Sequence, residues 1–299
     1  MYIDFHCDTA SLIYAESKQL KKNTYHIDLQ KTKKEYLAQW FAFFLNLKDI
    51  KIDVFNYFSI MYDYFMHQLR INNLKPISSY KEYKNNKGLS VFLSIEEGEV
   101  VKDGLHVVDK LQSMGITLMT LTWNYKNSLG SPHSINEGLT EYGKSVVDYL
   151  NNNKILLDVS HLSDLGIDDA LALTKKPIIA SHSNARAVKN HSRNLSDEHI
   201  KKIALTGGTI GINFYNAFLS DSYISKVNDI VYMAKYISNL AGVEGVVFGS
   251  DFDGIDCPLE ITDSSKITIL KNALYEEFGS DIADKFLYKN AERLIKENF

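Results

Sequence analysis

MYIDFHCDT, residues 1–9, has the pattern of a short buried strand that ends in His-x-Asp. Side chains at i and i+2 of a strand point to the same side, so His6 and Asp8 would project together from one strand end. An imidazole nitrogen and a carboxylate oxygen are suitable ligands for a divalent metal such as zinc. His-x-Asp alone is a weak motif, because a solvated polar pair at a strand end has the same pattern, so its meaning depends on the rest of the chain.

Seven further short apolar segments have the composition of buried strands, and helical segments alternate with them. The eight predicted strands cover residues 2–8, 38–47, 89–96, 116–123, 154–161, 177–182, 209–214 and 245–251. Strands that alternate with helices, without a composition break or linker, predict parallel strands joined by crossover helices. Eight such units favour a single α/β domain, residues 1–299, folded as a (β/α)8 TIM-type barrel. No Gly-rich phosphate loop follows the first strand, which argues against a dinucleotide-binding domain.

The segments between the strands divide into helices and polar loops. The predicted helices cover residues 9–19, 54–71, 104–114, 140–151, 164–173, 196–205, 227–241, 267–278 and 282–298. Ser163 and Ser196 are candidate helix N-caps, because a serine hydroxyl can accept a hydrogen bond from the first helical turn. The lysine-rich segment 81–87 is predicted to be a solvated turn.

Polar residues end several of the predicted strands, and in a barrel of this type chemistry collects at the C-terminal strand ends. Glu96 ends the third strand on the parity opposite to Val91, Leu93 and Ile95, so it points inward if the apolar parity packs on helices. The remaining polar ends are His161, His182 and Asp251 on the fifth, sixth and eighth strands. His161 has the same strand parity as the apolar residues Ile155, Leu157 and Val159. Its predicted role as a ligand therefore rests on its place at the strand end.

This set of three histidines and three carboxylates is what a two-metal hydrolase needs. Glu96 can bridge two zinc ions, because each carboxylate oxygen can take one metal. His6 and Asp8 would complete one ion, and His161 and His182 the other. Asp251 is then free to act as an acid/base beside a bridging water. A single histidine at a strand end is more often a structural residue, so the coincidence of five ligand-type residues on four strand ends carries the prediction.

Charge and cysteine content limit the partners of the protein. The net charge of −4 provides no basic footprint for nucleic acid. Two cysteines, Cys7 and Cys257, are too few for a disulfide framework, and the chain opens without the pattern of a signal peptide. The longest apolar run, 38–47, is too short to span a bilayer. We therefore expect a cytoplasmic protein without a membrane partner.

The sequence resembles the membrane dipeptidase (renal dipeptidase) family of zinc peptidases, in the amidohydrolase-like barrel group. The motifs that carry the resemblance are DFHCDT (4–9), IEEG (95–98), LTWN (121–124), DVSH (158–161), SHSNA (181–185), SRNLSD (192–197) and GSDFDG (249–254). It implies two zinc ions bridged by Glu96, with His6, Asp8, His161 and His182 as terminal ligands. It also implies that Arg193 receives the C-terminal carboxylate of the substrate, which suits a planar two-pronged donor. Without the resemblance, Arg193 would be taken for a surface loop residue.

The chain departs from the family pattern in two respects. Several members carry a histidine at the end of the fourth strand, thought to help polarise the scissile carbonyl, where this chain has Trp123. Polarisation would then come from a metal, from Asn124 or His133, or be weaker. Members at cell surfaces also have a signal, disulfides and a lipid anchor, and the lack of these features here argues against an extracellular protein.

The expected function is zinc-dependent hydrolysis of the peptide bond of free dipeptides, by attack of a metal-bridging hydroxide. One alternative is a barrel metallohydrolase acting on another small amide or ester, such as a lactam, a lactone or an N-acyl amino acid. Another is a non-catalytic binding protein of the same fold, which is disfavoured because all six site positions keep ionisable or ligating residues. The expected partners are small dipeptides, and a homodimer is left open.

Overall fold

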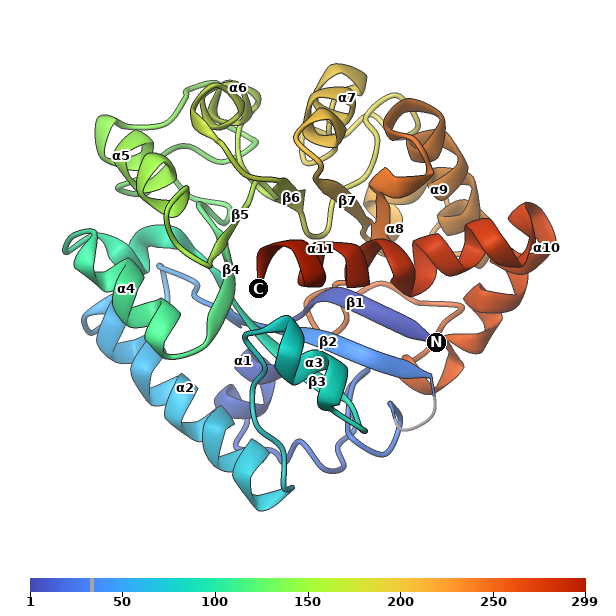
Figure 1. Cartoon of the computed structure of the whole chain (residues 1–299), viewed down its shortest axis with the longest axis horizontal. Coiled ribbons are helices and arrows are strands. Elements are labelled where there is room, and N and C mark those ends of the chain that lie inside the picture. Colours follow the sequence, from blue (N-terminus) through green and yellow to red (C-terminus); the bar gives the residue numbers. More distant parts are fainter. Residues whose placement is uncertain (33–34) are drawn as a thin grey trace.

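A computed structural model describes residues 1–32 and 35–299 as a closed barrel of parallel strands surrounded by helices (Figure 1). The strands follow one another in chain order around the barrel, and β1 pairs with β8 to close it. Their bounds are β1 (Tyr2–Cys7), β2 (Tyr36–Phe44), β3 (Ser90–Glu96), β4 (Ile116–Thr120), β5 (Leu156–Asp158), β6 (Ile178–Ala180), β7 (Thr209–Ile212) and β8 (Val246–Phe248). The predicted (β/α)8 architecture is confirmed.

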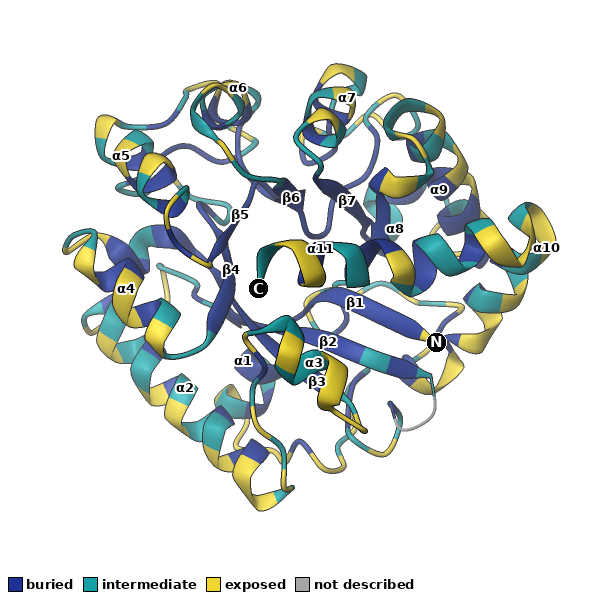
Figure 2. Ribbon diagram, viewed as in Figure 1, coloured by how far each residue is buried: buried dark blue, intermediate teal, exposed yellow. Residues whose placement is uncertain are grey.

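Most helices lie around the outside of the barrel and bury one face (Figure 2). The α-helices are α1 (Thr9–Ala15), α2 (Val54–Ile71), α3 (Tyr80–Asn85), α4 (His106–Ser113), α5 (Glu141–Leu150), α6 (Asp164–Leu173), α7 (Asp197–Leu205), α8 (Asn216–Leu219), α9 (Val227–Ala241), α10 (Thr268–Asp284) and α11 (Asn290–Asn298). Short 3-10 or π turns are η1 (Gly98–Val101), η2 (Val243–Gly245), η3 (Ser264–Lys266) and η4 (Lys285–Lys289). The predicted caps are confirmed, since Ser163 and Ser196 accept from backbone N–H groups of α6 and α7.

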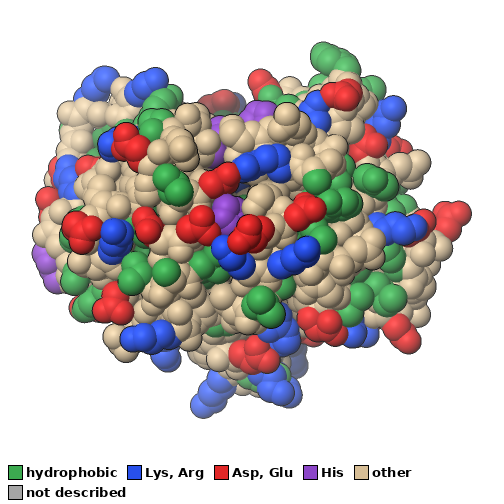
Figure 3. Space-filling model, turned by 90° about the horizontal axis from the view of Figure 1, so that it is seen from above, with side chains coloured by type: hydrophobic (Ala, Val, Ile, Leu, Met, Phe, Trp, Pro, Cys, Tyr) green, Lys and Arg blue, Asp and Glu red, His purple; other side chains and the backbone are tan. Residues whose placement is uncertain are grey.

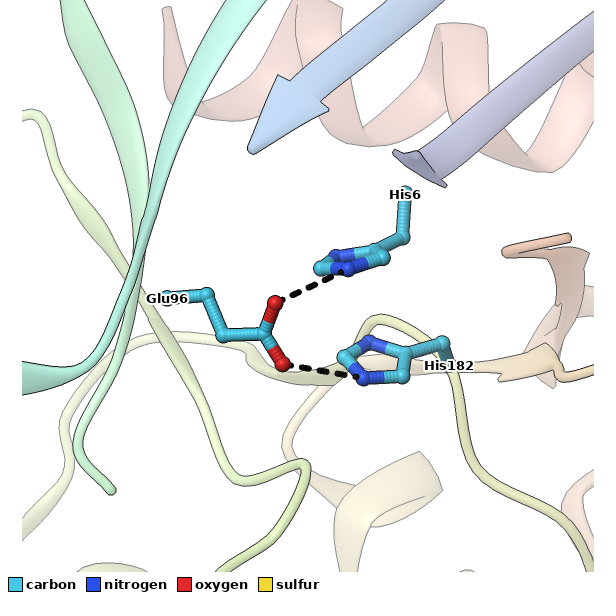
Figure 4. A group of neighbouring side chains, drawn as sticks. All are labelled: His6, Glu96 and His182. Atoms are coloured by element: carbon cyan, nitrogen blue, oxygen red, sulfur yellow. Dashed lines mark ion pairs between the residues drawn. The ribbon is translucent and has the colours of Figure 1, made fainter. Parts of the chain in front are cut away.

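Strand alternation separates two apolar layers. Val91, Leu93 and Ile95 of β3 belong to the layer between strands and helices, whereas Phe92 belongs to the barrel interior. In that interior the ring of Trp40 stacks on Phe92 at 4.1 Å between centroids. The predicted parity of β3 is therefore confirmed, and it directs Glu96 to the inside of the barrel (Figure 4).

Helix α11 closes the N-terminal end of the barrel, across which it lies in Figure 1. Leu294 and Ile295 of this helix pack with the interior apolar cluster. Asn290 donates a hydrogen bond to the carbonyl oxygen of Val246, the first residue of β8. The C-terminal strand ends, at the other mouth of the barrel, are left for a functional site.

The predicted solvated turn at 81–87 is wrong, because Tyr80–Asn85 forms helix α3. The Ser79 hydroxyl caps the helix by accepting from the N–H of Glu82. Tyr83 packs against the interior apolar cluster, which includes residues of α11. Packing of Tyr83 against the barrel thus accompanies a helix in a segment whose lysine content predicted a solvated turn.

Several predicted bounds are also wrong. The helix expected over 9–19 ends at Ala15, and Ser17 adopts a left-handed conformation with φ of +53° that stops it. The fifth, sixth and eighth strands end at Asp158, Ala180 and Phe248, earlier than predicted. The site residues expected on those strands therefore lie in the loops that follow them.

The surface shows no concentration of one charge on the face drawn in Figure 3, where Lys and Arg side chains are interspersed with Asp and Glu. Among residues 1–32 and 35–299, none of the helices combines the length and apolar character needed to cross a membrane.

Candidate metal centre

Glu96 is the centre of a cluster of imidazoles at the C-terminal mouth of the barrel. Its Oε2 atom lies 3.2 Å from Nε2 of His6. Its Oε1 atom lies 3.0 Å from Nε2 of His161 and 3.6 Å from Nε2 of His182. Figure 4 shows the carboxylate between His6 and His182, with one oxygen directed at each ring. The two oxygens of Glu96 therefore face two separate sets of imidazoles.

Asp8 and Asp251 lie on the His6 side of the cluster. Oδ2 of Asp8 is 3.6 Å, and Oδ1 of Asp251 3.8 Å, from Nε2 of His6. Potential ligand atoms of these three residues lie within 4.8 Å of one another, as do those of His6, Glu96 and His182. The fold thus brings together all six residues that the sequence singled out at strand ends.

Several polar atoms of the cluster are buried without a hydrogen-bond partner among the described residues. They include Nε2 of His6, Oε2 of Glu96 and Oδ1 of Asp8. Nε2 of His6 and Oε2 of Glu96 lie 3.2 Å apart but do not form a hydrogen bond, and leaving a buried polar atom unsatisfied costs about 1–3 kcal/mol. Imidazole and carboxylate lone pairs directed into one space suit a divalent cation such as zinc. The residues present therefore fit a metal site.

The two loop histidines are oriented by hydrogen bonds on their outer nitrogens. Nδ1 of His161 lies 2.9 Å from Oδ1 of Asn124, which can only accept, so a proton on Nδ1 would complete this hydrogen bond and leave the lone pair on Nε2. Nδ1 of His182 lies 2.7 Å from the Ser181 hydroxyl, which donates in turn to Asp158. The two Nε2 atoms lie 3.0 Å apart and present their lone pairs to the same place. Such outer partners fix the ring orientation of metal-binding histidines.

Two buried carboxylates that the sequence reasoning missed tie the strand ends together. Asp4 accepts from the backbone N–H and the hydroxyl of Ser250, beyond β8. Asp158 accepts from the N–H of Ser181 and from the Thr120 hydroxyl, on either side of β5. Burial raises the pKa of Asp4 to about 7 despite these hydrogen bonds. A carboxylate inside an otherwise apolar strand was the available signal, because a buried one must be hydrogen-bonded.

Left-handed backbone conformations direct two loop residues into the site. His161 has a φ of +68° and Asp251 a φ of +60°. Such conformations cost non-glycine residues about 1–3 kcal/mol and cluster at functional sites. The turn at His161 also explains how a residue with the strand parity of Leu157 can face the centre. Gly254 allows the close approach of its loop, since a Cβ there would lie 2.0 Å from Oδ2 of Asp8.

Burial and neighbouring charges set the protonation of the histidines. Burial lowers the pKa of His161 to about 3, and the positive charge of Arg193 adds to the effect. Burial and the charges of His6 and Arg193 likewise hold the pKa of His182 well below its usual value. For His6, burial is outweighed by Glu96 and Asp8, which raise its pKa well above its usual value. His161 and His182 are therefore neutral and able to donate lone pairs.

The carboxylates of the cluster are short of positive charge. Burial and the negative charge of Glu96 raise the pKa of Asp8 well above its usual value. Burial also raises the pKa of Asp251, although the charge of His6 opposes it. Burial opposes the ionisation of Glu96, but the positive charge of His6 prevails and holds its pKa well below the usual range. A protonated His6 balances only part of the negative charge of these carboxylates, and a divalent cation would balance more of it.

A cleft of about 550 Å³ opens over this cluster, and Asp8, Glu96, His161 and Asp251 line it. Trp123 also lines the cleft, where its ring lies 4.7 Å from that of Phe44. The site thus combines a polar floor with aromatic walls.

Glu97, a third buried carboxylate missed from the sequence, holds the loop that carries Trp123 and Asn124. It is fully buried, adopts a φ of +116° and accepts from the backbone N–H of Trp123 at 3.1 Å. It also accepts from the side chain of Asn127 and from the N–H of Glu99. Burial raises the pKa of Glu97 to about 7. Glu97 therefore connects the end of β3 to the loop whose Asn124 orients His161.

Arg193 is buried beside His182, so the interpretation of it as a surface loop residue is wrong. Its side chain donates to the carbonyl oxygen of His182 at 2.9 Å and to the Ser183 hydroxyl at 2.8 Å. Its Nε atom has no hydrogen-bond partner among the described residues. The guanidinium carbon lies 5.9 Å from the ring centroid of Phe218, a residue that lines the cleft.

Comparison with known protein families agrees with the sequence motifs. A family model described as membrane dipeptidase, peptidase family M19, matches residues 1–298. An uncharacterized dipeptidase of Schizosaccharomyces pombe is 33% identical over 193 residues, which are 62% of this chain and 46% of that protein. An uncharacterized protein of Klebsiella pneumoniae, from the pqqA 5′ region, is 35% identical over 190 residues, 58% of this chain and 69% of that protein. The matched part thus spans less than half of the yeast protein.

Solved structures agree on the fold. A metallo peptidase from Rhodobacter sphaeroides, liganded with a phosphinate mimic of the dipeptide L-Ala-D-Ala, matches with a TM-score of 0.90. It is 24% identical, and the match covers 100% of this chain and 99% of that one. The probable dipeptidase PvdM from Pseudomonas aeruginosa matches with a TM-score of 0.89 at 18% identity, over 99% of this chain and 95% of that one.

Proposed function

The chain belongs to the membrane dipeptidase family, and from that premise we propose that it is a zinc-dependent peptidase that cleaves free dipeptides. The observation that carries the proposal is the placement of Glu96, whose two oxygens face separate imidazole sets. The orphaned polar atoms of His6, Glu96 and Asp8 support it, because they lie where metal ligands would be needed.

In this proposal the cluster holds two zinc ions. His6, Asp8 and Oε2 of Glu96 would hold one ion, and Oε1 of Glu96 with His161 and His182 would hold the other. Zinc bound there would supply Lewis acidity and would make a water molecule more acidic, and so a better nucleophile, at neutral pH. The protein's part is to fix the ligands, through contacts such as that of Asn124 with His161.

Asp251 is the proposed acid/base, and Arg193 the proposed carboxylate receptor. Oδ2 of Asp251 accepts from Nδ2 of Asn213 at 2.8 Å, which leaves Oδ1 to exchange a proton. Asp251 takes a proton from the attacking water and gives it to the nitrogen of the departing amine. The Nε–H of Arg193 has no partner among the described residues, and each terminal nitrogen has a second hydrogen. Arg193 can therefore still donate hydrogen bonds to a substrate carboxylate.

The first prediction concerns metal content. Zinc-replete protein should contain about two zinc ions per chain, and Glu96→Gln should lose this pair, because an amide has only one oxygen to offer. Elemental analysis after gel filtration measures both. Glu276→Gln, an exposed position on α10, is the matched control and should keep both ions. Wild-type protein without bound metal, or a Glu96→Gln protein with two zinc ions, would contradict the assignment.

The competing function is hydrolysis of another small amide or ester. One observation favours it, namely that the Arg193 guanidinium already donates to His182 and Ser183, which leaves fewer donors for a free carboxylate. Zinc-loaded protein should be tested on a dipeptide panel beside a lactam, a lactone and an N-acyl amino acid. We expect turnover of dipeptides, and turnover confined to the other compounds would replace the proposal. The cytoplasmic location and the homodimer stay predictions.

A further inference from the structure

We propose that the cleft selects dipeptides by their N-terminal side chain and favours a bulky apolar one. This inference rests on the proposed dipeptidase function. The receiving surface, here called the apolar wall, consists of cleft-lining residues from the β1, β2 and β4 sides of the barrel. They are Leu12, Phe44, Ile50, Tyr57, Met61 and Trp123.

The apolar wall is incompletely covered by the protein itself. Phe44, Ile50 and Trp123 are only partly buried, although each lies within a cleft of about 550 Å³. The rings of Phe44 and Trp123 meet edge to face, with centroids 4.7 Å apart, and form a fixed corner beside the metal cluster. An apolar ligand group in this corner would remove both its own surface and that of the wall from water.

The position of Arg193 sets the direction in which a dipeptide would lie. Strands follow chain order around a closed barrel of eight, so β2 and β6 lie opposite each other. Arg193 contacts His182, two residues beyond β6, whereas Phe44 is the last residue of β2. A dipeptide backbone spans about 7 Å. With its carboxylate at Arg193 and its peptide carbonyl over Glu96, its N-terminal residue would reach the β2 side.

The C-terminal side chain would meet a different surface. The β7 and β8 side of the cleft is lined by residues that include Tyr215, Asp253 and Asp256. Asp256 is exposed, and the pKa of Tyr215 is raised by partial burial and by the negative charge of Asp256. This side mixes the apolar Phe218 and Ile255 with the exposed carboxylate of Asp256, so selection for an apolar side chain should be weaker at the C-terminal residue.

Two substrate series test the proposal on zinc-loaded protein. In the X-Gly series, kcat/KM should rise from Ala-Gly to Leu-Gly by at least about tenfold, the low end for apolar enlargement in a hydrophobic pocket. In the Gly-X series the same change of side chain should have a smaller effect. A binding measurement on the Asp251→Asn protein, by tryptophan fluorescence, should show the same order in Kd for Leu-Gly and Ala-Gly.

A matched pair of variants locates the selection in the apolar wall. Ile50→Ala should reduce the Leu-Gly to Ala-Gly ratio of kcat/KM several-fold. Ile52→Ala, in the same loop but half exposed and outside the cleft lining, should leave that ratio unchanged. Trp123→Phe should keep the preference because it preserves an aromatic face, whereas Trp123→Ala should weaken it.

The outcomes separate the two proposals. Dipeptide turnover with a flat X-Gly series, or with a stronger dependence in the Gly-X series, overturns the inference about the apolar wall and leaves the dipeptidase function in place. Equal ratios in the Ile50→Ala and Ile52→Ala proteins also overturn it. Failure of zinc-loaded protein to cleave any dipeptide overturns the proposed function, and this inference falls with it.

Discussion

Asp251→Asn should lower kcat by at least ~10²-fold while zinc and substrate remain bound, which is the low end for the loss of a general acid–base group. Asparagine keeps the shape of the side chain but cannot take a proton. Asn213 donates to Oδ2 of Asp251, so the wild-type carboxylate is held in the cleft with Oδ1 directed towards the cluster. The chemical step should therefore lose its proton carrier without a change in the architecture of the site.

Steady-state kinetics and zinc analysis on the same preparation measure the effect. Asp63→Asn, an exposed position on α2, is the matched control and should behave like the wild type. Loss of zinc from Asp251→Asn would instead identify Asp251 as a ligand, since it lies within reach of His6 and Asp8. Two zinc ions with near-normal kcat would make Asp251 structural and direct the search to Asp253 and His133.

Of these two alternatives, neither is as well placed as Asp251. Asp253 already accepts from the Thr9 hydroxyl and from the backbone N–H of His26. His133 contacts the Ser192 hydroxyl at 2.8 Å, and burial lowers its pKa to about 4, with Arg193 adding to the effect. At neutral pH His133 is therefore uncharged and a poor source of protons.

Conversion of the C-terminal carboxylate of a good dipeptide substrate to an amide should cost about 2–5 kcal/mol of transition-state binding. That cost corresponds to a decrease in kcat/KM of about 30-fold to a few thousand-fold. The reason is that Arg193 is 97% buried as a residue, and the hydrogen-bond acceptors of its guanidinium among the described residues are a carbonyl and a hydroxyl, both neutral. A substrate carboxylate would supply the missing negative charge.

A change in the substrate is a cleaner test than removal of Arg193, because the side chain also holds His182 and Ser183 in place. The penalty for the amide should be compared in the wild type and in Arg193→Lys, where it should become smaller if the guanidinium is the receptor. Equal turnover of acid and amide by the wild type would remove Arg193 from this role. Such a result would favour the hydrolase of other small amides or esters.

The sequence by itself determined the barrel and the gathering of the proposed ligands at one mouth, because both follow from short-range patterns. Apolar segments that alternate with helices predicted the strand order, and parity along β3 predicted that Glu96 points inward. Strand ends in a parallel barrel all open at one mouth, so the polar residues near them had to meet there. Resemblance to a known family supplied what periodicity could not, namely a role for Arg193.

Only the tertiary structure decided how those residues are held. Asp4 and Asp158 tie strand ends through serine residues far away in the sequence, and no local pattern identifies such partners. His161 reaches the centre through a left-handed conformation, and α3 forms because Tyr83 meets the interior cluster beside α11. These features depend on contacts between segments that are distant in the chain, and the sequence did not reveal them. Strand and helix periodicity depends on neighbouring residues, so the sequence did reveal the strands and helices.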